Sequence, residues 1–340
     1  MKATNSKNNI VIFKLGSLGD TIVALPFFHR IAERFPDSRR ILLTNFPETA
    51  SASPLEAILE GTGLIHEYIS YPTRVRSPAI LWALRQKLAA LKADTLIYLL
   101  QGRSLFRSRR DYLFFRLCGF SNIIGTPFTA ELCTGKIDPQ TGFVERECER
   151  MARCLEALGP IDLHAREGWD LHLTERERQT GRAAVLPAVN GRYIAINMGG
   201  KVVENDWGSD NWLALIDKLA VRYRNYGLVA VGAAQDAERA TRVGAHWPGS
   251  FANLCGRLTP RESAAALEGA VVFIGHDSGP LHMASAVGVH CVGIYGGNNL
   301  PMKWHPIYGD HKIIHKMAGV LHIKVDEVMQ AVESILKNLT

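Results

Sequence analysis

Apolar runs alternate along the chain with longer segments in which apolar residues recur at helical spacing. In the first half, the apolar runs lie near residues 10–14, 40–44, 95–100 and 122–125. Helical spacing is found near 20–35, 78–92, 107–118 and 143–158. Continuous apolar runs are typical of strands buried on both faces of a parallel sheet. The pattern therefore predicts an α/β domain in which strands and helices alternate.

A second series of the same kind follows a region rich in turn residues. Gly159-Pro160, Gly168 and Pro187 surround a charged stretch over 175–182, which predicts a short exposed helix and a domain junction near 165–172. The next apolar runs cover 193–197, 227–231, 271–274 and 291–294. The sequence thus predicts two tandem α/β domains, 1–168 and 169–322. An apolar stripe predicts a final amphipathic helix over 323–340.

The composition of the chain narrows the class of protein. The chain has 340 residues, 47% of them apolar, which suits an ordinary globular protein with two domains. Its six cysteines are scattered without C-x-x-C or zinc-type spacing, so we expect no metal site and reduced thiols. No apolar stretch has the length of a signal peptide or a membrane span. We expect a cytoplasmic protein whose contact with a membrane is peripheral.

Positive charge is concentrated in one segment. The segment between Gln101 and Cys118 contains one acidic residue, Asp111, and five basic residues: Arg103, Arg107, Arg109, Arg110 and Arg116. The segment follows the apolar run over 95–100, where open α/β sheets bind their ligands. It is interpreted as a solvated helix face, a site for an acidic substrate or a contact with an anionic membrane. Nucleic acid is disfavoured because the net charge is only +6 and no recognition signature is present.

The segment from Phe273 to Ala284 combines a short apolar strand with a helix start. Asp277 is predicted to be the helix N-cap, and Pro280 suits the first turn. The amides of Ser278 and Gly279 would then lie at the positive end of the helix dipole, where phosphate binds. The alternative is a capped turn without a ligand.

The start of the chain has the same organisation. An apolar run over 10–13 leads through Lys14, Gly16 and Gly19 to Asp20 and a helix. The spacing G-x-x-G differs from the dinucleotide fingerprint, so a nicotinamide cofactor is disfavoured. If the two domains face each other across a cleft, the Asp20 carboxylate could take a proton from an attacking hydroxyl opposite the phosphate site. Its alternative role is a helix N-cap.

In these segments the chain resembles the heptosyltransferase family of bacterial glycosyltransferases, glycosyltransferase family nine. The resemblance rests on the segments 14–21, 197–200, 232–236, 277–284 and 295–306. It implies a GT-B fold, in which we expect the C-terminal helix to pack back on the first domain. It further implies metal-independent, inverting transfer of a heptose from an ADP-sugar co-substrate to the inner core of lipopolysaccharide, with no bound cofactor.

The resemblance also assigns roles by motif. Asp20 matches the general base, Ser278 and Gly279 match ligands of the donor diphosphate, and Asp277 matches a residue at the transferred sugar. Gly199 falls in the donor site. The residue at the nucleotide ribose is Asp236 or Glu238, and Asp236 could instead be a helix N-cap. His282 could touch the donor or pack within its helix.

One departure from the family concerns a lysine. Where the family carries Lys-x-Trp-Pro, this chain has Asn205-Asp206-Trp207-Gly208. Lys201 is the candidate replacement at the donor phosphate, or else a solvated surface residue. For the anionic glycolipid acceptor, the candidates are Arg103, Arg107, Arg109 and Arg110, with Arg74 and Arg76 as the alternative set. A nucleotide-sugar epimerase and a catalytically silent binding protein remain alternative functions.

Overall fold

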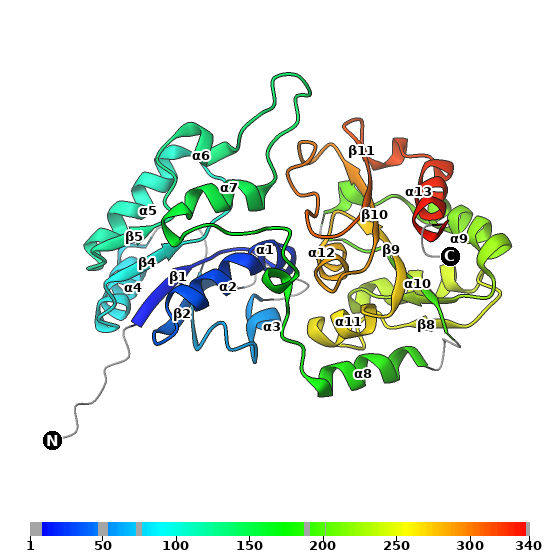
Figure 1. The fold of residues 1–340 in the computed structure, drawn as a ribbon, viewed down its shortest axis with the longest axis horizontal. Helices are drawn as coiled ribbons and strands as arrows, with labels where there is room; N and C mark the ends of the chain where they lie inside the picture. The colour runs from blue at the N-terminus through cyan, green and yellow to red at the C-terminus, as the bar shows by residue number, and fades with distance from the viewer. Residues whose placement is uncertain (1–8, 47–53, 73–76, 187–190, 201, 338–340) are drawn as a thin grey trace. The chain divides into compact units, whose positions relative to one another are not determined.

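The fold consists of two compact units, Met1–Leu163 and His164–Thr340, each built around one parallel sheet (Figure 1). The structure is a computed structural model that describes residues 9–46, 54–72, 77–186, 191–200 and 202–337. The division at Leu163 lies a few residues before the domain boundary expected from sequence at 168/169.

The first unit contains a five-stranded sheet in the order β3-β2-β1-β4-β5. Its strands are β1 (Asn9–Phe13), β2 (Arg39–Asn45), β3 (Glu67–Tyr71), β4 (Thr95–Tyr98) and β5 (Asn122–Ile124), all paired in parallel. Its helices are α1 (Leu18–Val23), α2 (Leu25–Arg34), α3 (Glu56–Leu59), α4 (Pro78–Ala90), α5 (Leu105–Leu117), α6 (Ala130–Thr134), α7 (Glu147–Cys154) and the 3-10 turn η1 (Glu156–Leu158).

The central strand β1 organises this unit because it pairs with β2 on one side and β4 on the other. Its residues Val11 and Ile12 are fully buried, as the apolar run predicts. α4 and α5 cover the same face of the sheet, where Leu84 and Phe115 pack with Val11. The chain leaves β1 towards β2 and later returns to β4, so the carboxyl ends of β1 and β4 form a topological switch point.

The helix predicted over 20–35 is two helices, α1 and α2, with a break at Ala24. Pro26 lies in the first turn of α2. Proline has no N–H to donate to the preceding turn, so a continuous helix would be kinked or broken at this point.

The second unit contains a six-stranded sheet in the order β11-β10-β9-β6-β7-β8. Its strands are β6 (Tyr193–Asn197), β7 (Gly227–Ala230), β8 (Phe251–Asn253), β9 (Ala270–His276), β10 (Cys291–Gly296) and β11 (Lys312–Lys316), again all parallel. Its α-helices are α8 (Glu175–Val185), α9 (Ser209–Tyr223), α10 (Ala237–Gly244), α11 (Pro260–Leu267), α12 (Gly279–Ala286) and α13 (Val325–Lys337). Its 3-10 turns include η2 (Arg166–Trp169), η4 (Val203–Asn205), η5 (Ala234–Asp236) and η6 (Val320–His322).

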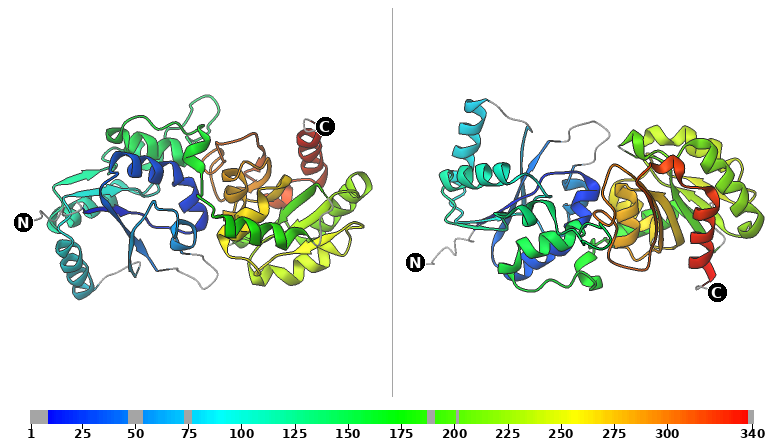
Figure 2. Two further views of the ribbon diagram at one scale, coloured as in Figure 1. Left: turned by 60° about the horizontal axis from the view of Figure 1, so that its bottom comes forward. Right: turned by 90° about the horizontal axis from the view of Figure 1, so that it is seen from above.

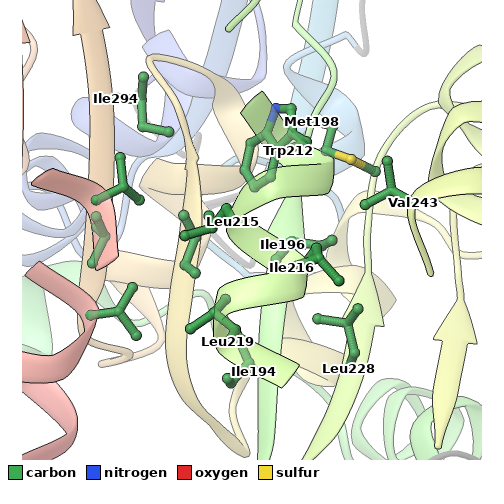
Figure 3. Packing of buried hydrophobic residues seen from close by; sticks show 14 of the residues in the cluster. Ile194, Ile196, Met198, Trp212, Leu215, Ile216, Leu219, Leu228, Val243 and Ile294 are labelled. Carbon is green, nitrogen blue, oxygen red and sulfur yellow. The ribbon is translucent and has the colours of Figure 1, made fainter. Parts of the chain in front are cut away.

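The core of this unit lies between the sheet and α9. Figure 3 shows Leu215 and Leu219 of α9 over the side chains of β6, including Ile194 and Ile196. All of these residues are fully buried. The apolar runs of the strands and the apolar face of α9 are thus buried against each other in one hydrophobic core.

The C-terminal helix α13 packs on its own unit, which corrects the expectation that it packs on the first domain. Val328, Val332 and Leu336 are buried in the same cluster as the β-strands of the second unit. α13 lies beside α9 in Figures 1 and 2, and the Lys218 ammonium is 2.5 Å from the Asp326 carboxylate. The short connection from β11 delivers the apolar stripe directly to the apolar surface left open beside α9.

Candidate functional site

Three loops meet at the carboxyl edge of the six-stranded sheet. β6 lies between β7 and β9: the chain adds β7 and β8 on one side of β6 and then β9, β10 and β11 on the other, so the carboxyl ends of β6 and β9 form a topological switch point. Gly199 follows β6, Asp236 follows β7 and Asp277 follows β9. The structure therefore brings together three of the residues predicted to bind the donor.

The first turn of α12 lies at this edge. Ser278 is its N-cap residue, with φ −153°, and Gly279 is its first helical residue. The predicted N-cap, Asp277, is one residue too early: its carboxylate instead accepts a hydrogen bond from the Asn299 side chain at 2.7 Å. The first N–H groups of a helix have no intrahelical acceptor and carry the positive end of the dipole. The position therefore suits an anion.

Asn197 holds this helix start against the sheet. Its side-chain oxygen accepts a hydrogen bond from Ser278 Oγ at 3.1 Å, and its Nδ2 donates to the Val231 carbonyl at 2.9 Å. The residue is 2% exposed. One buried amide thus links the ends of β6, β7 and β9. Asn197 belongs to the motif 197–200, but no role was predicted for it from sequence, although a polar residue that closes an apolar strand is a usable signal.

Asp236 lies against two glycines from the neighbouring loops. A Cβ added at Gly199 or Gly232 would collide with its carboxyl group, so both positions require glycine while the carboxylate stays in place. Asp236 Oδ2 accepts a hydrogen bond from the Ala233 N–H at 2.8 Å, and burial raises the pKa of this carboxyl. Asp236 stands at the N-cap position of α10, but its side chain makes no capping hydrogen bond.

The segment that departs from the family is packed into the unit. Trp207 is fully buried and donates its indole N–H to the Ile323 carbonyl at 2.9 Å. Asn205, at the position of the family lysine, is 4% exposed and accepts a hydrogen bond from Asn298. Lys201, the proposed replacement, lies outside the described residues. The Asn205 position is therefore filled by a neutral buried side chain.

Arg239 is a cation near Asp206 and Asp236 for which no role was predicted from sequence. Both terminal nitrogens of Arg239 donate to the carboxylate of Asp206, each at 2.7 Å. The pKa of Asp236 is raised by burial, and the positive charge of Arg239 opposes part of that rise. A bidentate partner neutralises most of this charge. Arg239 thus fixes the loop that carries Asp206.

Two histidines of this region are buried. His276 ends β9 and is 1% exposed; its Nε2 accepts a hydrogen bond from the Trp207 N–H at 3.2 Å. Burial lowers the pKa of His276 to about 4, so the ring is neutral near pH 7. His282 lies within α12 and is 6% exposed. Both rings are part of the packed interior behind the helix start.

In the first unit, Asp20 lies directly after the central strand. It is the third residue of α1 and forms a capping box with Ser17. Oδ2 of Asp20 accepts hydrogen bonds from the Ser17 N–H at 2.7 Å and from Ser17 Oγ at 3.2 Å. Ser17 is therefore the N-cap residue, and the alternative assignment of Asp20 as N-cap was wrong. Within the described chain, Oδ1 accepts no such bond.

Lys14 is buried between charged groups next to Asp20. Its side chain is fully buried, and its Nζ has no hydrogen-bond partner among the described residues. Burial lowers the pKa of Lys14, while the negative charges of Asp20 and Glu147 oppose that shift and Arg150 adds to it. Glu147 and Arg150 form a buried ion pair at 2.5 Å.

The arginines predicted to bind the acceptor follow β4, the neighbour of β1, but they differ in their surroundings. Arg103 and Arg110 bind the two carboxylate oxygens of Asp111, at 2.6 and 2.7 Å. Arg107 and Arg109 are exposed and form no ion pair within the part of the chain that the structure describes. Arg74 and Arg76, the alternative set, lie outside the described residues.

A family model for glycosyltransferase family 9 (heptosyltransferase) matches residues 133–324. This is more than half of the chain, and the protein belongs to this family. It is a glycosyltransferase built from two Rossmann-like domains. A search of curated proteins found no significant match.

Solved structures show the same fold. A family 9 glycosyltransferase from Veillonella parvula has 20% identity and a TM-score of 0.72, with 99% of this chain and 100% of that chain covered. The ADP-heptose lipopolysaccharide heptosyltransferase II of E. coli has 15% identity and a TM-score of 0.68, covering 97% and 99%. E. coli heptosyltransferase WaaC, solved with ADP-2-deoxy-2-fluoro heptose, has 17% identity and a TM-score of 0.64, covering 96% and 99%.

Two further observations concern the described residues. None of their helices is both long enough and apolar enough to cross a membrane. No group of three or more histidine, cysteine, aspartate or glutamate side chains in these ranges is arranged to hold a metal ion.

Proposed function

We propose that the protein transfers a heptose from ADP-heptose to an inner-core lipopolysaccharide acceptor, with inversion at the anomeric carbon and without a metal ion. The acceptor hydroxyl attacks the anomeric carbon, the bond from this carbon to the diphosphate oxygen breaks, and ADP leaves. Asp20 takes the proton of the attacking hydroxyl. The E. coli structure with an ADP-heptose analogue supports this choice of donor.

The observation that carries the proposal is the start of α12 at the switch point of the second sheet. Ser278 is held there by Asn197, and the helix dipole points its positive end outward. The amides of Ser278 and Gly279 stabilise the departing diphosphate. Asp277 contacts the sugar, and Lys201 supplies the positive charge that Asn205 lacks.

The nucleoside is assigned to the loops after β6 and β7. The Asp236 carboxylate lies against the backbone of Gly199 and Gly232, where it can accept hydrogen bonds from ribose hydroxyls. His282 supports this site from within α12. Its burial favours a packing role over direct contact with the donor.

The carboxylate of Asp20 is arranged for proton transfer. One oxygen is fixed by Ser17, so the other can face a hydroxyl in a defined orientation. The acceptor's carboxylates and phosphates pair with arginines after β4, foremost Arg107 and Arg109, which are exposed. The protein meets this glycolipid at the cytoplasmic face of the inner membrane.

Product analysis tests the reaction. The protein is incubated with ADP-heptose, with and without a heptose-free lipopolysaccharide core. The proposal requires ADP release and heptosylated core only when acceptor is present, with the opposite anomeric configuration by NMR. Free sugar and nucleotide in the absence of acceptor would identify an epimerase. ADP-heptose binding without turnover in either mixture would identify a silent binding protein.

Two measurements test the donor site. Lys201→Ala should weaken ADP binding by about 1–3 kcal/mol in calorimetry, the range for a charge-assisted contact. An unchanged affinity would remove Lys201 from the site. Activity should persist in EDTA, and activity that EDTA abolishes and magnesium restores would contradict the metal-free mechanism.

A further inference from the structure

Large apolar side chains are exposed on α4 and α5. Trp82 on α4 is 57% exposed, and Phe106, Leu113 and Leu117 on α5 are 77%, 61% and 68% exposed. Residues seven and four positions apart share one face of a helix, so the three α5 side chains form a single row. Contiguous exposed apolar side chains typically mark an interaction site.

The two helices present these residues on one surface. Both pack on the same face of the five-stranded sheet, through Leu84 and Phe115. On the outside, Arg85 donates from Nε to the Leu117 carbonyl at 2.9 Å, and its guanidinium lies 5.0 Å from the Trp82 ring centre. A single arginine therefore joins the tryptophan of α4 to the end of the apolar row on α5. We call this surface the α4–α5 face.

The α4–α5 face is positively charged. Both helices also carry basic residues: Arg85, Lys87, Arg107, Arg109, Arg110 and Arg116. The structure describes both helices throughout, and their one acidic residue, Asp111, is 8% exposed and paired with Arg103 and Arg110. The surface thus has exposed aromatic and aliphatic groups among cations and lacks an exposed carboxylate.

We propose that the α4–α5 face docks on an anionic lipid bilayer, with Trp82, Phe106, Leu113 and Leu117 entering the interface. Interfacial helices combine these residue types, and arginines attract anionic headgroups. A protein partner is less well matched, because the centres of protein interfaces are depleted in charge, whereas here basic residues share both helices with the exposed apolar side chains. The inference rests on the proposed function for the identity of the membrane.

Vesicle binding tests this proposal without donor or acceptor, so its failure is distinguishable from a failure of transfer. The full chain is sedimented with phosphatidylglycerol-containing vesicles and with phosphatidylcholine vesicles. We expect binding to the anionic vesicles that weakens as salt rises. We expect at least a tenfold weaker partition for the triple variant Phe106→Ser, Leu113→Ser, Leu117→Ser.

Controls separate docking from misfolding. Val221→Ser removes an equally exposed apolar residue, 81% exposed on α9, and should bind vesicles like the wild type. The triple variant should keep wild-type turnover on a lipid-free acceptor fragment. Equal vesicle binding by the triple variant and the wild type would overturn the proposal. So would a wild type that ignores anionic vesicles, or that only self-associates through this face.

Discussion

Gly16 and Asp20 are in such close contact that a Cβ at Gly16 would lie 2.6 Å from the Cβ of Asp20. Gly16 also has φ +137°, a conformation that residues with side chains rarely adopt. Its N–H donates to the Asn45 side chain at 3.1 Å, which fixes the loop to β2. The glycine therefore sets the position of the carboxylate.

Gly16→Ala should displace the carboxylate of Asp20. Turnover should fall by about tenfold or more, because a general base that is out of position transfers the proton more slowly. The affinity for ADP should be unchanged, since the donor is assigned to the second unit. Gly119→Ala is the matched control: its φ is +104°, but a Cβ there meets nothing within 4 Å. If turnover falls equally in both variants, the effect comes from backbone strain and not from displacement of Asp20.

Lys14→Met should change the pH dependence of stability. The pKa of Lys14 in the folded protein is lowered from 10.5 by burial, so the unfolded chain binds the proton more tightly. The free energy of unfolding should therefore rise with pH up to about 10.5 in the wild type. The variant should lose this contribution and be at least as stable at pH 7, because a buried nitrogen without a hydrogen-bond partner among the described residues is replaced by an apolar side chain.

Urea titrations at several pH values measure that slope. Lys87→Met, which changes an exposed lysine, is the control and should leave the slope unchanged. Identical slopes in the Lys14 variant and the wild type would contradict the account of Lys14.

His276 should make the second unit sensitive to mild acid. Its folded pKa of about 4 is below the ordinary 6.5, so the stability it contributes is present above pH 6.5 and is lost as pH falls towards 4. The loss between pH 7 and pH 5 should be about 2 kcal/mol. His276→Gln should lack this loss in urea titrations. An equal loss in the variant would mean that other groups are responsible.

Every central strand could be predicted from sequence, whereas of the four edge strands only β5 was predicted. The apolar runs located β1, β4, β6 and β9, which are buried on both faces. The strands that no run predicted, β3, β8 and β11, are all at sheet edges. Edge strands are short or partly exposed, so their side chains need not be continuously apolar. β11, for example, has the sequence KIIHK and no fully buried residue.

The candidate site could be predicted only in part, for a similar reason. Loop residues that follow a predicted strand, such as Asp20 and Asp277, were located because their place in the chain fixes their edge of the sheet. Asn197 and Arg239 act through partners distant in sequence, Ser278 and Asp206, which only the fold brings close. The N-cap was misplaced by one residue at Asp277, because Ser278 is an equally good capping type.

The exposed arginines of α5 should select the acceptor. Charge reversal of Arg107 and Arg109 should raise the KM for a lipid-free acceptor about tenfold and weaken its salt dependence, with ADP affinity unchanged. Reversal of Arg103 is a poorer test because it also breaks the contact with Asp111. If acceptor kinetics change instead in a variant with Arg74 and Arg76 reversed, the acceptor site belongs to that earlier segment.

The most direct test of the mechanism is the turnover of Asp20→Asn with ADP-heptose and lipopolysaccharide core. An asparagine oxygen can still accept the hydrogen bonds from Ser17, so α1 keeps its capping interaction, but an amide cannot take a proton. Turnover should fall by about a hundredfold or more while calorimetry shows wild-type ADP affinity. Wild-type turnover in this variant would contradict the assignment of Asp20 as the general base.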